Sequence, residues 1–346
     1  MNSKRMWKCS WITPLSCLVL AGCGSSGEEG TPTPDVDPTP TATSIPTEPP
    51  TPEPTPCAID SVLIPGESSY PESISVGSDG SLYISGTVSG SVFKAAACTD
   101  QAAALGSIPQ PYSVVGVRVD EARKLVWACG TDFNGYGNPK LFALDLTSGT
   151  VKATHALQLE AGLCNDMVFD AAGNVYVTES FSSQVFRVAA ADVLSDTEAP
   201  VWLSDPSMLG LPNDFGLNGI AIHDSTLWIV NSSTGKLYQV GIDADGSAGE
   251  VAELAVTPAL SRPDGIALRD SGELLVIEGP SNNRLMTLTF SGSAATATEV
   301  EAGFDWPTAV GVDGDFAWVV ESQFDHLFGY DPNPPGDFHV VRVDLP

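Results

Sequence analysis

Six positions recur at the start of six similar segments within residues 57–346, and four of the six carry a carboxylate or amide oxygen. The positions are Glu72, Val115, Asn165, Asn218, Asp264 and Thr308. Two carboxylates and two amide carbonyls that converge on one axis are hard ligands, which suits Ca²⁺ better than a softer metal. A carboxylate beside such a metal can also take a proton from an attacking water. The alternative is that Asn and Asp begin strands because they form turns, without any ligand.

These positions belong to a repeat of strands. Each segment has a short apolar strand, an Asp, Gly or Ser turn and a second apolar strand, which is typical of a β-hairpin. A third alternating strand follows every hairpin, and a weaker fourth follows the first five. The hairpin segments start at Pro71, Val114, Cys164, Leu217, Pro263 and Pro307. The pattern predicts an all-β fold, a six-bladed β-propeller with four antiparallel strands per blade.

The last unit lacks a fourth strand because the chain ends after its third. We expect Ala58–Ile64 to supply it, so that the N-terminal strand closes the ring. The innermost strands of a propeller line its central channel, and the first residue of each points toward the axis. The six recurring positions are therefore expected to meet at one mouth of the channel. A closed ring without free strand edges also indicates a monomer.

Four cysteines fall in pairs within this arrangement. Cys57 opens the closing strand, and Cys98 ends the third strand of the neighbouring first blade. Cys129 ends the second strand of blade two, and Cys164 begins the first strand of blade three. In an exported protein, we predict the disulfides Cys57–Cys98 and Cys129–Cys164.

The first 22 residues predict export. A basic start is followed by an apolar stretch, Trp11–Leu20, which is far too short to span a bilayer. The sequence Leu-Ala-Gly-Cys that ends at Cys23 resembles the bacterial lipobox, whose cysteine is acylated. This resemblance implies a lipid anchor, palmitate included, in the bacterial cell envelope. Gly24 after the cysteine resembles the sorting rule that favours the outer membrane.

Residues 23–56 follow the predicted signal as a tether. Most of this stretch alternates Thr and Pro, which cannot form a core and favours an extended polyproline-like chain. We therefore expect three parts: a signal peptide at 1–22, the lipidated cysteine and tether at 23–56, and the propeller at 57–346. Contact with the membrane is expected through the N-terminal lipid only.

Charge excludes several classes of function. The chain has 15 Lys and Arg against 43 Asp and Glu, a formal net charge of −28. Nucleic acids, anionic membranes and polyphosphate substrates would be repelled. Hydrophobic residues at 42% are nevertheless enough for a packed core, so the acidity is not that of a disordered chain.

Several of these motifs resemble one family across residues 57–346. Cys-Asn-Asp at 164–166, Asn-Gly-Ile-Ala-Ile from Asn218, Pro-Asp-Gly-Ile-Ala-Leu from Pro263 and the early Glu72 are similar to the senescence-marker-protein, gluconolactonase and paraoxonase-like propellers. The resemblance implies a divalent metal, commonly Ca²⁺, held by Glu72, Asn218 and Asp264. It makes Asn165 either a fourth ligand or a substrate contact.

The same resemblance implies an activity. It favours hydrolysis of lactones or related esters, with Asp264 as both metal ligand and candidate general base, and Asn165 beside it. The chain lacks the His pair of the paraoxonase pattern. The alternative function is a non-catalytic propeller that binds an envelope protein or a glycan, with calcium in a structural role.

A second polar set ends the second strands of four blades. Glu179, Asn231, Glu278 and Glu321 could form a rim that orients substrate, or they could be solvated strand ends. His326 lies in the long loop between the last two strands and is expected to overhang the channel mouth. It is either a proton-transfer group or a surface histidine.

Aromatic residues are frequent in the loops expected near the mouth. Phe133 and Tyr136 lie in one loop, Phe215 precedes the fourth blade, and Phe328 and Tyr330 lie in the long last loop. They could wall an apolar or sugar-stacking pocket, or they could pack on the blades.

Overall fold

The computed structural model describes residues 59–346. The predicted signal peptide at 1–22, the lipidated Cys23, the tether at 23–56 and Cys57 lie outside the described residues. In the described part, no helix is long and apolar enough to cross a membrane.

Strands dominate the described residues, and the first three sheets follow chain order. The first contains β2 (Ile74–Val76), β3 (Leu82–Gly86), β4 (Ser91–Ala95) and β5 (Ala103–Ser107). The second contains β6 (Ser113–Asp120), β7 (Leu125–Thr131), β8 (Lys140–Asp145) and β9 (Val151–Leu157), with β13 (Thr197–Ala199) added in parallel to β9. The third contains β10 (Cys164–Phe169), β11 (Val175–Glu179), β12 (Gln184–Val188) and β14 (Val201–Ser204).

The second half of the described chain forms one large sheet and one small sheet. The large sheet contains β15 (Leu217–His223), β16 (Thr226–Asn231), β17 (Lys236–Ile242), β18 (Ala248–Thr257), β22 (Ala294–Ala302), β21 (Arg284–Ser291), β20 (Leu274–Glu278) and β19 (Pro263–Leu268) in spatial order. The small sheet contains β23 (Pro307–Asp313), β24 (Phe316–Glu321), β25 (Phe338–Asp344) and β1 (Ser61–Ile64). The helical elements are the 3₁₀ helix η1 (Pro206–Met208) and the short α1 (Phe324–Leu327).

The large sheet differs from the prediction of six separate four-stranded blades. It consists of two antiparallel runs, β15–β18 and β19–β22, whose outermost strands pair in parallel. This pairing joins Ala255–Thr257 to residues 294–296. The two strands are long, with 10 and 9 residues, so their ends reach beyond their own runs and meet.

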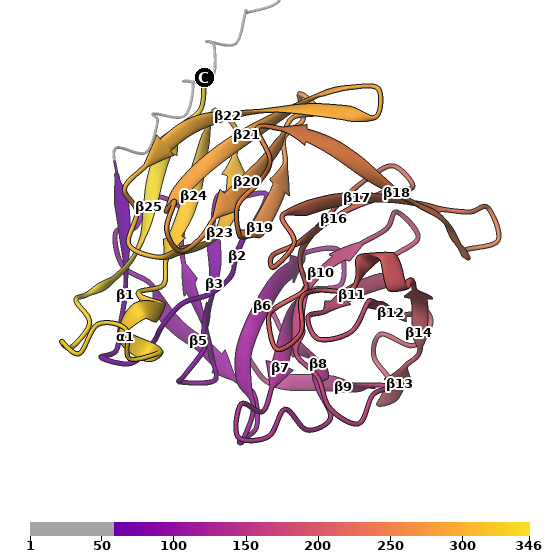
Figure 1. Ribbon diagram of the computed structural model, residues 1–346. Helices are drawn as coiled ribbons and strands as arrows, with labels where there is room; N and C mark the ends of the chain where they lie inside the picture. The colour runs from indigo at the N-terminus through magenta and orange to yellow at the C-terminus, as the bar shows by residue number, and fades with distance from the viewer. Residues whose placement is uncertain (1–58) are drawn as a thin grey trace, which may run out of the picture. The chain divides into compact units, whose positions relative to one another are not determined.

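The inner strands form a closed ring. Strands β2, β6, β10, β15, β19 and β23 each contact the next, and β23 contacts β2 again. Side-chain hydroxyls join neighbours: Thr178 Oγ1 donates to the Asn218 carbonyl at 2.7 Å, and Thr308 Oγ1 donates to the Glu72 carbonyl at 2.7 Å. Figure 1 shows these strands around a common centre. The predicted all-β propeller is confirmed.

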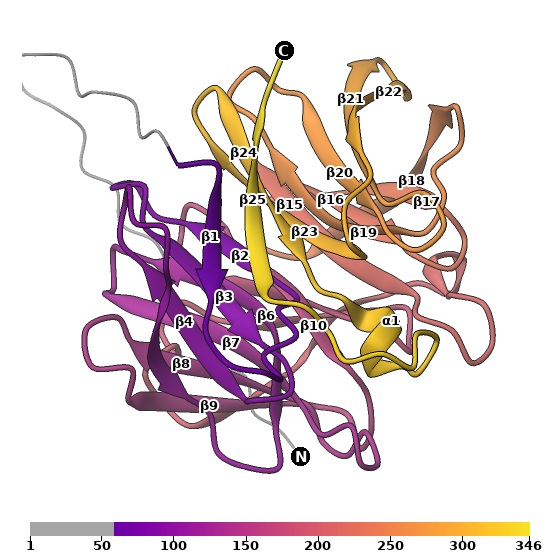
Figure 2. The same cartoon turned by 90° about the vertical axis from the view of Figure 1, so that its left-hand side faces the viewer.

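The predicted closure by the N-terminal strand is also confirmed. Strand β1 pairs antiparallel with β25, from Ser61 opposite Val341 to Ile64 opposite Phe338. Figure 2 shows the two strands side by side. Sheet edges that would otherwise remain open are joined here, which ties the two ends of the described chain together.

Each inner strand begins at one end of the ring, which we call the upper face. The second strands β3, β7, β11, β16, β20 and β24 run antiparallel and end there. The tight turns within the hairpins lie at the opposite end, the lower face. Loops of the upper face therefore surround the predicted channel mouth.

One predicted disulfide is confirmed. Cys129 in β7 is bonded to Cys164 in β10, with their Cα atoms 5.2 Å apart. The bond links two successive sheets directly beside Asn165. The pairing of Cys57 with Cys98 stays a prediction because Cys57 is outside the described residues.

A buried histidine joins β9 to β13. Nδ1 of His155 is 2.9 Å from Thr197 Oγ1, and Nε2 is 3.4 Å from the Val193 carbonyl oxygen. Because that carbonyl can only accept, Nε2 carries the proton and Nδ1 accepts from the hydroxyl. The ring also stacks on Trp127. Burial lowers the pKa of His155 below its ordinary value.

This burial predicts acid sensitivity. Because the pKa of His155 is lower in the folded state, its contribution to stability is complete above about pH 6.5 and is lost as the pH falls below that value. The free energy of unfolding should fall by up to about 1.4 kcal/mol per pH unit more in the wild type than in His155→Gln. Urea unfolding between pH 7 and pH 5 measures this difference. The exposed His223→Gln should retain the wild-type dependence, and equal slopes for all three proteins would refute the assignment.

Candidate functional site

Five inner strands have a register shift at their upper ends. The shifts lie between Val114 and Val117, Cys164 and Met167, Leu217 and Ile220, Pro263 and Ile266, and Pro307 and Val310. Each one spans a predicted channel position and the residue after it. A β-bulge leaves one residue unpaired and re-aims its side chain. The shifts therefore explain how these side chains leave the alternation of their strands.

The residue after the channel position is small in most strands because neighbouring backbones meet there. A Cβ added to Gly116 would collide with the Asn165 carbonyl oxygen, and one on Gly219 would collide with the Asp264 carbonyl oxygen. Asp166 occupies the corresponding position in β10. The close approach of successive inner strands brings the channel side chains within reach of one another.

Three carboxylates meet at the upper end of the channel. Burial raises the pKa of Glu72 well above its usual range, and the charges of Asp264 and Asp166 raise it further. Burial also raises the pKa of Asp264 to about 7, while a hydrogen bond from the Asn218 side chain and the charge of Arg262 oppose the rise. The structure thus brings together Glu72, Asn218 and Asp264, as the sequence predicts, and adds Asp166.

Asp166 was not among the site residues predicted from the sequence. Its Oδ1 accepts from the Met167 backbone N–H at 2.7 Å, and its Oδ2 accepts from the Ile220 backbone N–H at 3.3 Å. Burial raises its pKa, against the nearby charge of Arg118. A signal was present in the sequence, since the equivalent residues of the other blades are small (Ser73, Gly116, Gly219, Gly265 and Ala309) and only this one is ionisable.

The other predicted channel residues differ in what they offer. Asn165 is buried at the start of β10, in the position equivalent to Asn218. Thr308 shares a 2.5 Å hydrogen bond with Ser322 and also holds the Glu72 carbonyl. Val115 is buried among apolar residues. Asn165 is therefore the remaining predicted channel residue that can offer an oxygen to a ligand. The Thr308 hydroxyl instead hydrogen-bonds the backbone carbonyl of Glu72.

The donor set fits a hard divalent cation. Three carboxylates and the Asn218 amide supply oxygen, and the raised carboxylate pKa values show that the site disfavours its own negative charge. Arg118 and Arg262 are the cations that act on it. A divalent cation held by these carboxylates would relieve the repulsion more directly than either arginine, because it would carry two positive charges.

A second group lies in the last loop of the upper face. Among the described residues, Asp325, His326 and Asp331 are the three ionisable side chains whose ligand atoms lie within 4.8 Å of one another. The channel carboxylates are more widely spaced. Nδ1 of His326 donates to the Asn333 carbonyl at 2.9 Å, and Nε2 lies 4.0 Å from Asp325 Oδ1. His326 is thus held within its own loop, and its proton-transfer role stays a prediction.

The second polar set holds loops together. Glu179 is fully buried, and its oxygens accept from the backbone N–H groups of Leu163, Phe181 and Ser182 at 2.7, 3.0 and 2.7 Å. The donors of these three hydrogen bonds are all backbone N–H groups of the upper-face loops. Neither an exposed substrate rim nor a solvated strand end describes such a group.

The equivalent residues behave in the same way. Glu278 is fully buried and forms a 2.7 Å ion pair with Arg284. Asn231 is fully buried and donates to a backbone carbonyl of η1 at 2.8 Å. Glu321 is partly buried and accepts from a backbone N–H at 2.9 Å. The sequence pattern correctly placed these four residues at strand ends but did not predict their role. Their role depends on which loop folds over each strand end, and the strand sequence does not contain that information.

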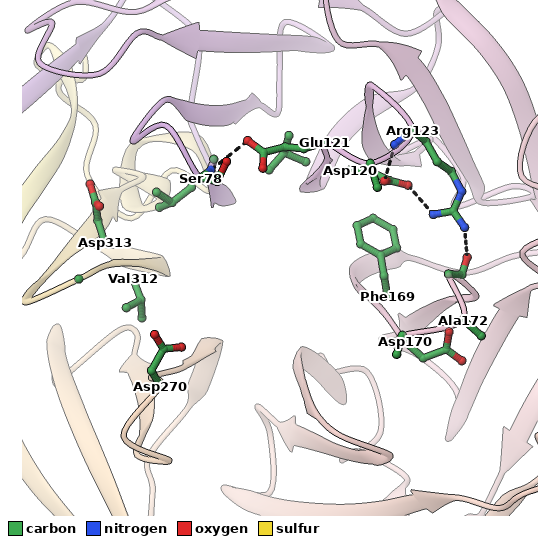
Figure 3. Close-up of a pocket in the computed structure, with 17 residues that line it drawn as sticks. Ser78, Asp120, Glu121, Arg123, Phe169, Asp170, Ala172, Asp270, Val312 and Asp313 are labelled. Atoms are coloured by element: carbon green, nitrogen blue, oxygen red, sulfur yellow. Dashed lines mark hydrogen bonds and ion pairs between the residues drawn. The ribbon is translucent and has the colours of Figure 1, made fainter. Parts of the chain in front are cut away.

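A cavity of about 1030 Å³ opens at the lower face. Hairpin turns of several blades line it, and Figure 3 shows Asp270 and Asp313 on one side and Asp120 with Arg123 on the other. Arg123 and Asp120 form a 2.9 Å ion pair. None of the predicted channel residues lines this cavity. It is therefore separate from the candidate site of the upper face.

Comparisons with known proteins agree on architecture. No family model matches the chain, and no curated protein matches it. Solved structures do match. The allergen Mala s 1 of Malassezia sympodialis has a TM-score of 0.64 at 13% identity, covering 83% of this chain and 96% of its own. The shared property is the propeller fold.

Two further matches have functions in their names. Regucalcin from Agrobacterium tumefaciens, described as a calcium-binding protein, has a TM-score of 0.58 at 13% identity and covers 83% of this chain and 95% of its own. Virginiamycin B lyase from Staphylococcus aureus has a TM-score of 0.57 at 15% identity, with 82% and 83% covered. A calcium-binding protein and a lyase thus share the propeller fold. The fold therefore does not determine the activity, which must be argued from the site.

Proposed function

We propose that the chain is a calcium-dependent hydrolase of lactones or related esters, similar to gluconolactonase. The observation that carries the proposal is the convergence of Glu72, Asp166 and Asp264 with Asn218 at the upper end of the channel. A calcium-binding propeller among the similar structures supports the choice of metal. We count six blades in this proposal, taking the eight-stranded sheet as two blades joined at their outer strands.

Each side chain has a defined part in the proposed reaction. Glu72, Asn218 and Asp264 hold the cation, which when bound would polarise the ester carbonyl and stabilise the oxyanion. Asp264, whose carboxylate would lie beside the attacking water, takes the proton of that water when it attacks the ester. The Asn165 amide either completes the metal ligands or orients the substrate. The disulfide at Cys164 restrains Asn165.

Export and anchoring are part of the same proposal. Cys23 would carry the lipid, and residues 23–56 would hold the propeller away from the bilayer of the bacterial envelope. The ring, closed by β1 and β25, supports a monomer.

A lactone panel tests the proposed activity. We expect acid release in the presence of Ca²⁺ and a loss of at least about 100-fold on chelation, since a metal oxyanion site contributes several kcal/mol. The measurement is proton release in weak buffer. Glu121→Gln, a change at the lower-face cavity, should leave the rate unchanged. A folded protein that binds Ca²⁺ but hydrolyses no lactone or ester would instead support the non-catalytic propeller that binds an envelope protein or glycan.

A further inference from the structure

An aromatic row crosses the upper face. Phe133 and Tyr136 lie in the loop after β7, Phe181 in the turn after β11, and Phe215 just before β15. Their ring centroids are 5.8 Å apart for Phe133 and Tyr136, 4.9 Å for Tyr136 and Phe181, and 5.8 Å for Phe181 and Phe215. Three loops from different sheets thus contribute to one continuous strip.

Two rings of the aromatic row remain open to solvent. Phe133 and Phe181 are each 40% exposed, whereas Tyr136 and Phe215 are partly buried and pack against the core. Leu209 and Leu211, on the segment that packs through Gly210 against Gly216, are 52% and 54% exposed. Tyr136 and Phe215 thus fix the row to the blades, and Phe133 and Phe181 present its open face. A contiguous exposed apolar strip of this kind marks a surface that another apolar group covers.

Two hydrogen-bonded links connect the row to the candidate site. Asp214 accepts from the Phe215 backbone N–H at 2.8 Å and from the Arg262 side chain at 2.6 Å. The positive charge of Arg262 in turn lowers the pKa of Asp264. Ser180, the neighbour of Phe181, donates to the Leu217 carbonyl at 2.8 Å. Leu217 directly precedes Asn218. The inner end of the row is therefore continuous with the channel mouth.

We propose that the aromatic row binds an alkyl chain of the substrate. This inference rests on the proposed function, because it places the reacting ring at Asn218 and Asp264 and the chain along the row. The rings at the outer end meet edge to face, at 85° and 83°, and Phe181 and Phe215 stack at 24°. The plane changes along the row, which is therefore an uneven apolar surface and not one flat platform for a sugar ring. Leu209 and Leu211 add exposed apolar side chains on the segment that lies beside Gly216, next to Phe215.

Binding of non-hydrolysable lactams separates this inference from the activity. In calorimetry with Ca²⁺, affinity should rise about twofold per methylene from unsubstituted γ-butyrolactam to its octyl derivative, since a half-covered methylene contributes about half of its full burial. Phe181→Ala should weaken the octyl lactam about tenfold and leave the unsubstituted lactam unchanged. Tyr330→Ala, an exposed aromatic of the same face outside the row, is the matched control and should change neither.

The outcomes are distinguishable. Affinity that does not depend on chain length, or equal effects of Phe181→Ala and Tyr330→Ala, would overturn the inference even if lactones are hydrolysed. Chain-length-dependent binding without turnover of any lactone would support the row and overturn the hydrolase. Self-association that Phe181→Ala abolishes, with no binding of the octyl lactam, would assign the row to a second copy of the chain and overturn the inference.

Discussion

Asp264→Asn is expected to raise the stability of the calcium-free protein and to abolish its stabilisation by Ca²⁺. In the calcium-free state Asp264 adds to the unfavourable charge around Glu72, as the raised pKa values of both groups show. Removal of one negative charge relieves that cost, which we estimate at about 1–3 kcal/mol. The same change removes a charged ligand, so the calcium affinity should fall at least about 100-fold.

Thermal or urea unfolding with and without Ca²⁺ measures both effects in one experiment. For the wild type, Ca²⁺ at ~100 times its dissociation constant should add about 2.7 kcal/mol. Without Ca²⁺ the variant should have the higher free energy of unfolding, and Ca²⁺ should add almost nothing to it. The order of stability of the two proteins should therefore reverse when Ca²⁺ is added. Lactone turnover should be lost in parallel.

Asp270→Asn is the matched control. Asp270 is exposed at the lower-face turn of the same hairpin that carries Asp264. The control should behave as the wild type in both conditions. If Asp264→Asn destabilises the calcium-free protein, or if it is stabilised by Ca²⁺ as much as the wild type, the carboxylates do not form a cation site.

The sequence predicts the ring because its signals are local. Alternating apolar strands and turn residues define each hairpin, and a missing last strand requires that Ser61–Ile64 close the ring, as it does. The pairing of Cys129 with Cys164 follows from the same blade geometry. The proximity of Glu72 and Asp264 depends on the same repeat, since equivalent ends of inner strands must meet at one axis.

Features that depend on contacts between blades, or on how a loop folds over a strand end, could not be predicted. The parallel pairing at Ala255–Thr257 arises from two strands that extend past their own blades, and strand length alone does not reveal a partner. Glu179 was placed at a strand end, but its burial depends on the loop at Leu163 from the same blade's entry. Asp166 is the one ionisable residue at its repeat position, but its place beside the other carboxylates follows only from the close backbone contact seen at the equivalent glycines.

Removal of the Cys129–Cys164 disulfide is expected to weaken both the fold and the site. The bond closes a loop with a sequence separation of 35 residues. A loop of that size corresponds to about 4 kcal/mol of lost chain entropy in the unfolded state. Both sulfurs are buried in the core between two sheets, so the Cys129→Ala and Cys164→Ala double variant also loses packing there.

The site should respond because Cys164 directly precedes Asn165 and Asp166 at the register shift of β10. Without the bond to β7, the shift is restrained mainly by hydrogen bonds such as that of Asp166 to Ile220. We therefore expect a roughly tenfold loss of calcium affinity beside the loss of stability, as for changes to groups that orient metal ligands. Denaturant unfolding and calcium titration measure the two effects. Cys98→Ala, which leaves β10 intact, should keep the calcium affinity, whereas an equal loss in both variants would mean that general destabilisation, and not the position of Asn165, weakens the site.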